Sequence, residues 1–434
     1  MNAPSFSQNL FSNRIRFAWI LDPKKDLLFY IGSALAGWLY VAVIAYAIFN
    51  LQNPLTDPLA TLKLGGLHVP LTLELLVVLS WAFILDAPHI WATLGRTLFD
   101  PDEWRTRRRV LLFSFVWFLV GPAAILAPYL VGSVTATMGS PLSSGTLAFG
   151  AVLFFVLFRL WAYYHVVRQH WGFFGLYKRK ANDSDKGGPQ DRLDKWFFNL
   201  SLYLPLVMFL TSSYFAETPG FPDLGLRTPI WGEWSIGAVI YPLAWAGFLA
   251  ILLIYIANQV RRWRQGQVLN GNKLLYMLLI IPLHVVAFSH PVMAVFIVPL
   301  VTVGHNIQYH CIVYQFAQNK YKPKVEREYR WAKVLFKNFA IYAAIGLVFT
   351  FAFYRGPWIE WLKDLLGLQL DVVMLNSIGM MAGIKNPEAL GLGERILAAS
   401  LLGFAMQHYY LDSKIWRVSK DKDVAKNLKV DEDA

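Results

Sequence analysis

The sequence predicts an all-α fold: a polytopic integral membrane helical bundle of about ten transmembrane helices, with both termini in the cytoplasm. Of the 434 residues, 56% are hydrophobic and only 16% are charged, whereas a soluble domain carries about 25% charged residues. The apolar residues gather in runs of about 20, the length that crosses the hydrocarbon core of a bilayer. Lysine and arginine are concentrated in every second loop between these runs, which predicts the orientation.

Ten apolar runs are predicted to cross the membrane. They are residues 27–49, 71–93, 109–131, 146–168, 196–213, 236–258, 274–290, 292–314, 335–354 and 392–411. We therefore expect a single transmembrane domain over residues 1–434. The mixed segment 356–390 is predicted to lie at the outer interface, and residues 413–434 are predicted to form a cytoplasmic tail.

The loops on one side of the bundle are rich in basic residues. The stretch "WRTRRRV" after span 71–93 is an example, whereas the loop "GSVTATMGSPLSSG", residues 132–145, has no lysine or arginine. Because basic loops stay in the cytoplasm, this alternation accounts for the net charge of +12 without a nucleic-acid partner. No cleavable signal pattern is visible, and we expect the protein in the inner membrane of a bacterium.

Histidines gather at the predicted inner ends of four spans, in the stretches "LDAPHIW", "YYHVVRQHWGF", "GHNIQYHC" and "MQHYYLDSKIWR". Ionisable side chains within apolar spans are rare and usually functional. Their common depth predicts one metal site, in which each residue is a ligand or orients a ligand. The residues are His89, His165, His170, His305, His310, His408, Asp86 and Asp412.

The spacing of these residues limits how they can act together. His408 and Asp412 are four residues apart and share a helix face. His165 and His170 are five apart, as are the two histidines of "GHNIQYHC", which is about 140° around an ideal helix. Such a pair suits either one metal on a locally loosened helix or two neighbouring metals.

Span 274–290 carries two further histidines, His284 in its middle and His290 at its outer end. They join the metal site if this span and the next are shorter or re-entrant. Otherwise we expect each to hydrogen-bond a neighbouring helix. His68, in a predicted outer loop, is expected to be an interfacial polar residue.

The number of histidines points to a reactive metal site. A structural zinc site takes four ligands and leaves no open position, and six or more histidines exceed that number. Imidazole suits Zn, Cu, Fe and Ni, so the residues fit two metals, or one metal with additional roles. The single cysteine, Cys311, excludes a cysteine-ligated iron–sulfur cluster. A site inside an apolar bundle suits a lipid-like substrate.

The H-x4-H pairs on inward-facing helix ends resemble the histidine boxes of integral-membrane di-iron desaturases and hydroxylases. That group includes fatty-acid desaturases and alkane hydroxylases, and its usual boxes contain adjacent His-His pairs, which this chain lacks. The resemblance implies two non-haem irons, or one, with O2 as co-substrate for hydroxylation or desaturation of a lipid-like molecule. It implies an external electron donor of the ferredoxin or reductase type. The implied iron ligands are His165, His170, His305 and His310, completed by His89 and His408.

Three other functions stay open. The chain is also similar to bacterial membrane β-carotene-cleaving dioxygenases, a similarity carried by the ending "HYYLDSKIWR". Such an enzyme puts both oxygen atoms into a polyene without a reductant. Paired histidines could instead ligate the haem of an electron-transfer protein. A metal or proton transporter would need ionisable groups at several depths.

Overall fold

The computed structural model describes residues 14–140, 142–183, 187–218, 224–354, 392–418 and 420–429. This part of the chain is helical, as predicted, apart from two small sheets. Strand β1 (Ile15–Arg16) pairs in parallel with β4 (Leu269–Asn270), and β2 (Ala60–Leu64) pairs antiparallel with β3 (Leu67–Leu71). The predicted interfacial segment 356–390 lies almost wholly outside the described residues.

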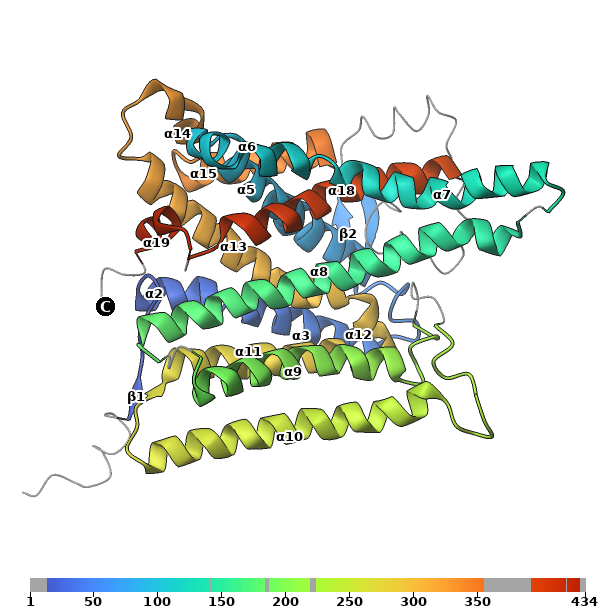
Figure 1. Ribbon diagram of the computed structural model, residues 1–434, viewed down its shortest axis with the longest axis horizontal. Helices are drawn as coiled ribbons and strands as arrows, with labels where there is room; N and C mark the ends of the chain where they lie inside the picture. Colours follow the sequence, from blue (N-terminus) through green and yellow to red (C-terminus); the bar gives the residue numbers. More distant parts are fainter. Residues whose placement is uncertain are drawn as a thin grey trace, which may run out of the picture.

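Each of the ten predicted spans falls on one or more of the helices drawn in Figure 1. Helices η1, η2 and η4 are π-helices and η3 is a 3-10 helix. The helices in chain order are α2 (Pro23–Lys25), η1 (Asp26–Ile31), α3 (Ala34–Asn50), α4 (Leu73–Val77), η2 (Val78–Asp86), α5 (Ala87–Leu98), α6 (Pro101–Ser114), α7 (Trp117–Thr137), α8 (Ser144–Lys180), α9 (Pro189–Thr211), α10 (Ile236–Arg264), α11 (Gly271–Ala287), α12 (Pro291–Val295), α13 (Ile297–Tyr321), η3 (Arg327–Tyr329), α14 (Arg330–Leu335), α15 (Phe339–Phe349), η4 (Thr350–Tyr354), α18 (Leu392–Ile415) and α19 (Lys422–Asn427).

The long apolar helices indicate a membrane protein. Among the described residues, five helices have the length and composition to cross a membrane, or up to seven if each of two bent pairs is one span. In the most apolar 18-residue stretch of α10, only 22% of the residues are buried within the protein. Leu243, Leu253 and Ile256 on this helix are more than half exposed. An apolar surface of this kind is stable in lipid and unfavourable in water. The count of ten spans and their orientation stay predictions.

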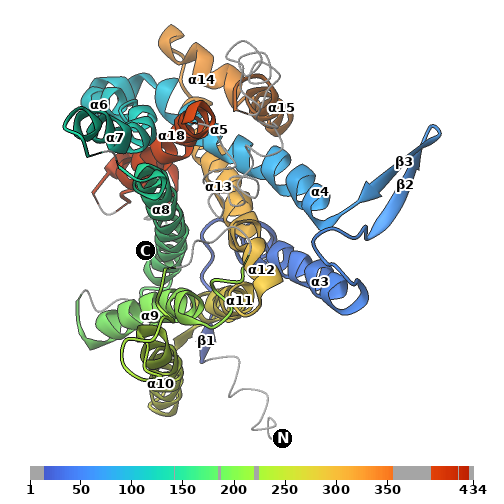
Figure 2. The ribbon, with the colours of Figure 1, turned by 90° about the vertical axis from the view of Figure 1, so that its right-hand side faces the viewer.

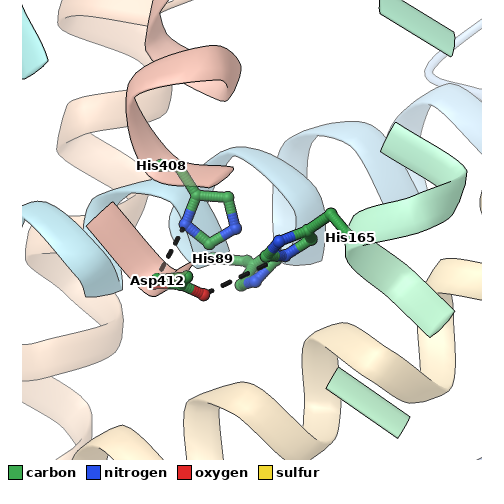
Figure 3. Close-up of side chains that lie close together, drawn as sticks. All are labelled: His89, His165, His408 and Asp412. Atoms are coloured by element: carbon green, nitrogen blue, oxygen red, sulfur yellow. Dashed lines mark ion pairs between the residues drawn. The ribbon is translucent and has the colours of Figure 1, made fainter. Parts of the chain in front are cut away.

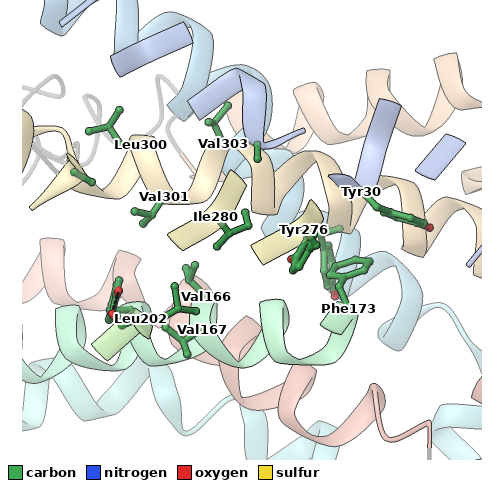
Figure 4. Packing of buried hydrophobic residues seen from close by; sticks show 14 of the residues in the cluster. Tyr30, Val166, Val167, Phe173, Leu202, Tyr276, Ile280, Leu300, Val301 and Val303 are labelled. Carbon is green, nitrogen blue, oxygen red and sulfur yellow. Dashed lines mark hydrogen bonds between the residues drawn. The ribbon is translucent and has the colours of Figure 1, made fainter. Parts of the chain in front are cut away.

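Helix α13 lies in the middle of the bundle, where α3, α5, α8 and α11 pack around it (Figure 2). Figure 4 shows the buried side chains of this contact, with Val166 of α8, Ile280 of α11 and Val301 of α13 facing one another. These branched side chains occupy the space between the three helices and fix the rotation of each helix about its own axis. The histidines of α8, α11 and α13 are held by the same packing.

A π-helix precedes His89. Pro88 has no N–H to offer the carbonyl of Ile84, and its ring crowds that carbonyl in a regular helix. The chain instead forms the π-helix η2, which ends with the N–H of Ala87 bonded to the carbonyl of Ala82, five residues back. The wider turns rotate the helix that follows about its axis. The direction of His89 therefore depends on a local feature that periodicity does not reveal.

The contact between α7 and α8 provides a stability prediction. Pro128 leaves the carbonyl of Ala124 without its usual helical donor, and α8 approaches this carbonyl at Gly150. A Cβ atom at Gly150 would lie 2.2 Å from the Ala124 oxygen. We expect Gly150→Ala to reduce the free energy of unfolding in detergent by about 1–3 kcal/mol through overpacking. Denaturant titration monitored by circular dichroism measures this change.

The matched control is Gly172→Ala on the same helix. A Cβ atom there meets nothing within 4 Å, and alanine favours a helix over glycine by up to about 1 kcal/mol. We therefore expect the control to be neutral or stabilising. Equal effects of the two substitutions would contradict the close approach of α7 and α8.

Candidate metal centre

Four side chains from three helices meet inside the bundle (Figure 3). They are His89 of α5, His165 of α8, and His408 and Asp412 of α18. One ligand atom from each can be chosen so that all lie within 4.8 Å of one another, and all four residues are buried. We name these four residues the HHHD cluster. A group of this composition could hold a metal ion.

Helix α18 contributes two of the four because His408 and Asp412 are one helical turn apart, as the spacing predicted. The Nδ1 atom of His408 lies 3.7 Å from Oδ1 of Asp412. The other carboxylate oxygen, Oδ2, lies 3.9 Å from Nε2 of His165. The carboxylate therefore stands between two rings, one from its own helix and one from α8.

Two hydroxyl groups hold one oxygen of Asp412 in place. Thr93 donates to Oδ1 at 2.8 Å and Tyr309 donates to the same atom at 2.6 Å. The indole Nε1 of Trp416 in turn donates to the Tyr309 hydroxyl at 3.2 Å. Partners of this kind orient a ligating carboxylate. They bind Oδ1 and leave Oδ2 directed toward His165.

The same hydrogen bonds fix the proton of His408. Its Nδ1 lies 2.6 Å from the Thr93 hydroxyl oxygen. The Thr93 hydroxyl also contacts the Tyr309 hydroxyl and Asp412 Oδ1. When Thr93 gives its single proton to Asp412, Nδ1 of His408 carries the hydrogen of its bond to Thr93. The lone pair of the neutral ring is then on Nε2, the form that binds a metal.

Three ring nitrogens in the cluster lack a partner. The Nε2 atoms of His89, His165 and His408 are buried and have no hydrogen-bond partner among the described residues. A buried nitrogen without a partner costs about 1–3 kcal/mol, so three at one place is an unfavourable arrangement. A bound metal ion would satisfy all three together with the carboxylate.

A cavity of about 160 Å³ adjoins the cluster. His89, His165 and His408 line it, and most of its other walls are apolar side chains of α8, α9 and α13. It extends to Phe215 and Leu224, which follow the end of α9. The cavity therefore offers apolar space with imidazole nitrogens along its wall.

The structure places His305 beside the cluster and His310 outside it. The ring centroid of His305 lies 4.9 Å from that of His89 and 5.2 Å from that of His165. His310 has both nitrogens engaged, Nδ1 with the Tyr342 hydroxyl at 2.7 Å and Nε2 with the Leu85 carbonyl at 3.3 Å. In this arrangement no nitrogen of His310 is left for a metal.

The remaining predicted residues take different positions. His170 of α8 and His284 of α11 lie together outside the HHHD cluster, with ring centroids 5.6 Å apart. His290 is partly exposed and caps α12, accepting the N–H of Val292 at 3.2 Å. Asp86 is half-buried and lines the cavity, but it is not one of the four clustered residues.

Two groups that orient the site were missed by the sequence analysis. Thr93 follows His89 by four residues, and Trp416 follows Asp412 by four. Each therefore lies on the same helix face as a candidate ligand. That spacing is the signal that could have identified them.

No protein-family model, curated protein or solved structure matches this chain.

Proposed function

We propose that this chain is an integral membrane non-haem iron oxygenase that hydroxylates or desaturates a lipid-like substrate with O2. One observation carries the proposal. The HHHD residues bring one ligand atom each within 4.8 Å of one another beside an apolar cavity. The three rings each have a buried Nε2 without a hydrogen-bond partner among the described residues. Histidine and carboxylate ligands with open positions are typical of non-haem iron sites that use oxygen. The HHHD cluster would hold one iron, and the resemblance to the histidine-box enzymes implies two irons, or one.

The residues around the cluster would each have a defined task. Iron supplies the reaction with O2, and the protein supplies binding and orientation. Thr93 and Tyr309 keep Asp412 directed at the cluster through their hydrogen bonds. The apolar walls of the cavity exclude water and hold the substrate beside the histidines.

The reaction needs electrons from another protein. Hydroxylation combines a C–H bond, O2, two electrons and two protons to give an alcohol and one water. Desaturation takes the same electrons and protons, removes two hydrogens from the substrate and gives two waters. We propose an acidic donor of the ferredoxin or reductase type. Exposed basic residues near the chain end and on α6 suit it, namely Arg105, Arg108, Arg109, Arg417 and Lys420.

The proposed setting is the bacterial inner membrane, with ten spans and both termini cytoplasmic. The alternation of basic loops supports this orientation. In Figure 1, β1 near the N-terminus and α19 near the C-terminus lie at the same end of the bundle. The HHHD cluster would then be supplied with electrons from the cytoplasm and with substrate from the lipid.

The test is metal-dependent turnover in lipid nanodiscs. We expect iron-loaded protein, a chemical reductant and a mixed lipid and hydrocarbon pool to give O2 uptake and an oxidised product. Mass spectrometry would show a gain of one oxygen atom or a loss of two hydrogens. Chelation should abolish turnover and iron should restore it. The control His68→Ala, an exposed histidine of β3, should behave as wild type.

Other outcomes would replace the proposal. Product formation without any reductant, with both oxygen atoms in a cleaved polyene, would favour the dioxygenase. A haem absorption band in purified protein would favour electron transfer. Ion uptake into proteoliposomes without O2 consumption would favour a transporter.

A further inference from the structure

We propose that the cavity beside the HHHD cluster binds a lipid alcohol, with the hydroxyl group at Asn306 and the apolar chain directed toward the bilayer. The inference deepens the proposed function and rests on it only for the reaction that follows binding. Asn306 lies on α13, directly after His305, and is fully buried. It lines the cavity, most of whose walls are apolar. The proposed substrate site therefore contains a buried amide.

Both polar atoms of the Asn306 amide lack a partner. Neither Nδ2 nor Oδ1 has a hydrogen-bond partner among the described residues. Thr302, one turn earlier on α13, lines the same cavity and differs in this respect. Its hydroxyl accepts from Nε1 of Trp81 at 2.8 Å and donates to the Val298 carbonyl at 2.7 Å. Buried polar groups that serve only the fold are normally satisfied in this way, so the Asn306 amide indicates a polar ligand in the cavity.

The amide needs a ligand that both donates and accepts. Its nitrogen carries two N–H donors, and its oxygen only accepts. A hydroxyl group donates one hydrogen and accepts through its lone pairs, so one alcohol can satisfy both ends of the amide. An ether or a ketone only accepts and would leave Oδ1 buried without a donor, which is unfavourable. A carboxylic acid ionises at about pH 4 and then also only accepts.

The size of the cavity limits how much of a lipid it encloses. An apolar cavity of about 150 Å³ holds a molecule of the size of benzene, and this cavity measures about 160 Å³. It can therefore enclose the hydroxyl end of a long-chain alcohol but not the whole chain. The rest of the chain must leave the cavity.

The cavity reaches the surface of the protein along α8. Leu160 of this helix lines the cavity and is 39% exposed. Leu153 and Leu157 precede it at helical spacing and are exposed as well, which forms an apolar stripe suited to contact with lipid. The chain of a bound alcohol can continue past Leu160 into the bilayer.

This orientation determines which carbons lie nearest to the HHHD cluster. The ring centroid of His305 lies 4.9 Å from that of His89 and 5.2 Å from that of His165. The Cα atom of Asn306 is only about 3.8 Å from that of His305, so the hydroxyl binds near the cluster. The C–H bonds that the cluster can reach are then those close to the hydroxyl. Hydroxylation there, with O2, two electrons and two protons, gives a diol and one water.

The experiment measures binding of radiolabelled hexadecanol to metal-free protein in detergent, by scintillation proximity. Unlabelled hexadecanol should compete about 10–100-fold better than fluorohexadecane or hexadecane, the range expected when a buried polar group is left without its partner. The fluorine atom has nearly the size of a hydroxyl group but cannot donate. Because no metal is present, the result does not depend on turnover.

A substitution locates the hydroxyl in the cavity. Asn306→Leu removes both polar atoms and keeps a branched side chain. It should lower the hexadecanol affinity by about 10–100-fold and leave the hexadecane affinity unchanged, so that the preference for the alcohol is lost. The control Asn50→Leu, at an exposed asparagine that ends α3, should bind all three ligands like the wild type. If Asn306→Leu does not fold, the ligand series on the wild type still tests the need for a hydroxyl.

Two results would overturn the alcohol site. Equal binding of the three ligands by the wild type would mean that the cavity does not recognise a hydroxyl and that the Asn306 amide holds only water. Stronger binding of hexadecanoate than of hexadecanol, lost in Arg159→Gln, would assign the cavity to an anionic ligand held by the arginine that also lines it.

The alcohol site and the proposed function fail separately. If either result were found while iron-loaded protein still oxidised lipid with O2, the proposed function would stand with another substrate. Asn306-dependent binding of hexadecanol without any O2-dependent turnover would establish the site and reject the oxygenase. Where turnover occurs, mass spectrometry of the derivatised product should place the new oxygen atom or double bond within a few carbons of the hydroxyl.

Discussion

Replacing Asp412 by asparagine should empty the HHHD cluster without unfolding the protein. Asparagine has the size of aspartate, and its amide oxygen can still accept from Thr93 and Tyr309. It lacks the negative charge and is a poorer ligand. We expect metal affinity at the cluster to fall by more than about 100-fold, beyond the loss caused by removing an orienting partner. Competition with a fluorescent chelator measures the affinity.

A substitution with a smaller expected effect on metal affinity removes the Tyr309 hydroxyl, which holds the Asp412 carboxylate. Tyr309→Phe removes a hydrogen bond of 2.6 Å to Asp412 and should lower the affinity by about 10–100-fold. Tyr46→Phe, on an exposed tyrosine of α3, is the control and should have no effect. If Asp412→Asn binds metal like the wild type, the carboxylate is not a ligand and the cluster is a hydrogen-bonded network.

The second large effect concerns the stability of the C-terminal end of α5. Arg96 is 1% exposed, and its Nη1 donates to Oε1 of Glu103 at 2.8 Å. Its guanidinium lies against the rings of Phe316 and Trp416. Removing one member of a buried ion pair leaves a charge that water does not solvate, at a cost of about 3–5 kcal/mol. We expect Glu103→Ala to reduce the free energy of unfolding by this amount.

Unfolding by denaturant in mixed micelles, followed by circular dichroism, measures this loss. Glu328→Ala is the control, because Glu328 pairs with Arg105 at the surface, where water already solvates both groups. It should leave the midpoint unchanged within error. A similar small effect of both substitutions would show that Arg96 finds another partner or is hydrated.

The sequence was sufficient for the helical class and for the approximate positions of several long helices. Apolar runs such as 146–168 and 236–258 fall on α8 and α10. A membrane span needs about 20 consecutive apolar residues to cross the bilayer, and such a run can be recognised from composition alone. The pairing of His408 with Asp412 was predictable for a similar reason. A spacing of four residues on one helix fixes a shared face, whatever packs against it.

The sequence could not decide which histidines meet. It grouped His310 with the site and left His284 between two roles, whereas the structure engages both nitrogens of His310 with other groups and sets His284 beside His170. How far each helix is rotated about its axis depends on packing against α13 and on the π-helix before His89. Neither is visible as a periodic pattern.

The sequence by itself therefore determined the all-α class, the approximate positions of several long helices and the stretches that carry its ionisable residues. The tertiary structure alone decided that His89, His165, His408 and Asp412 form one cluster. It also decided that Thr93 and Tyr309 hold the carboxylate. The physical reason is that composition and spacing determine only which residues share a face of one helix. A metal site needs side chains from several helices to point at one place. Only the packing of those helices sets these directions.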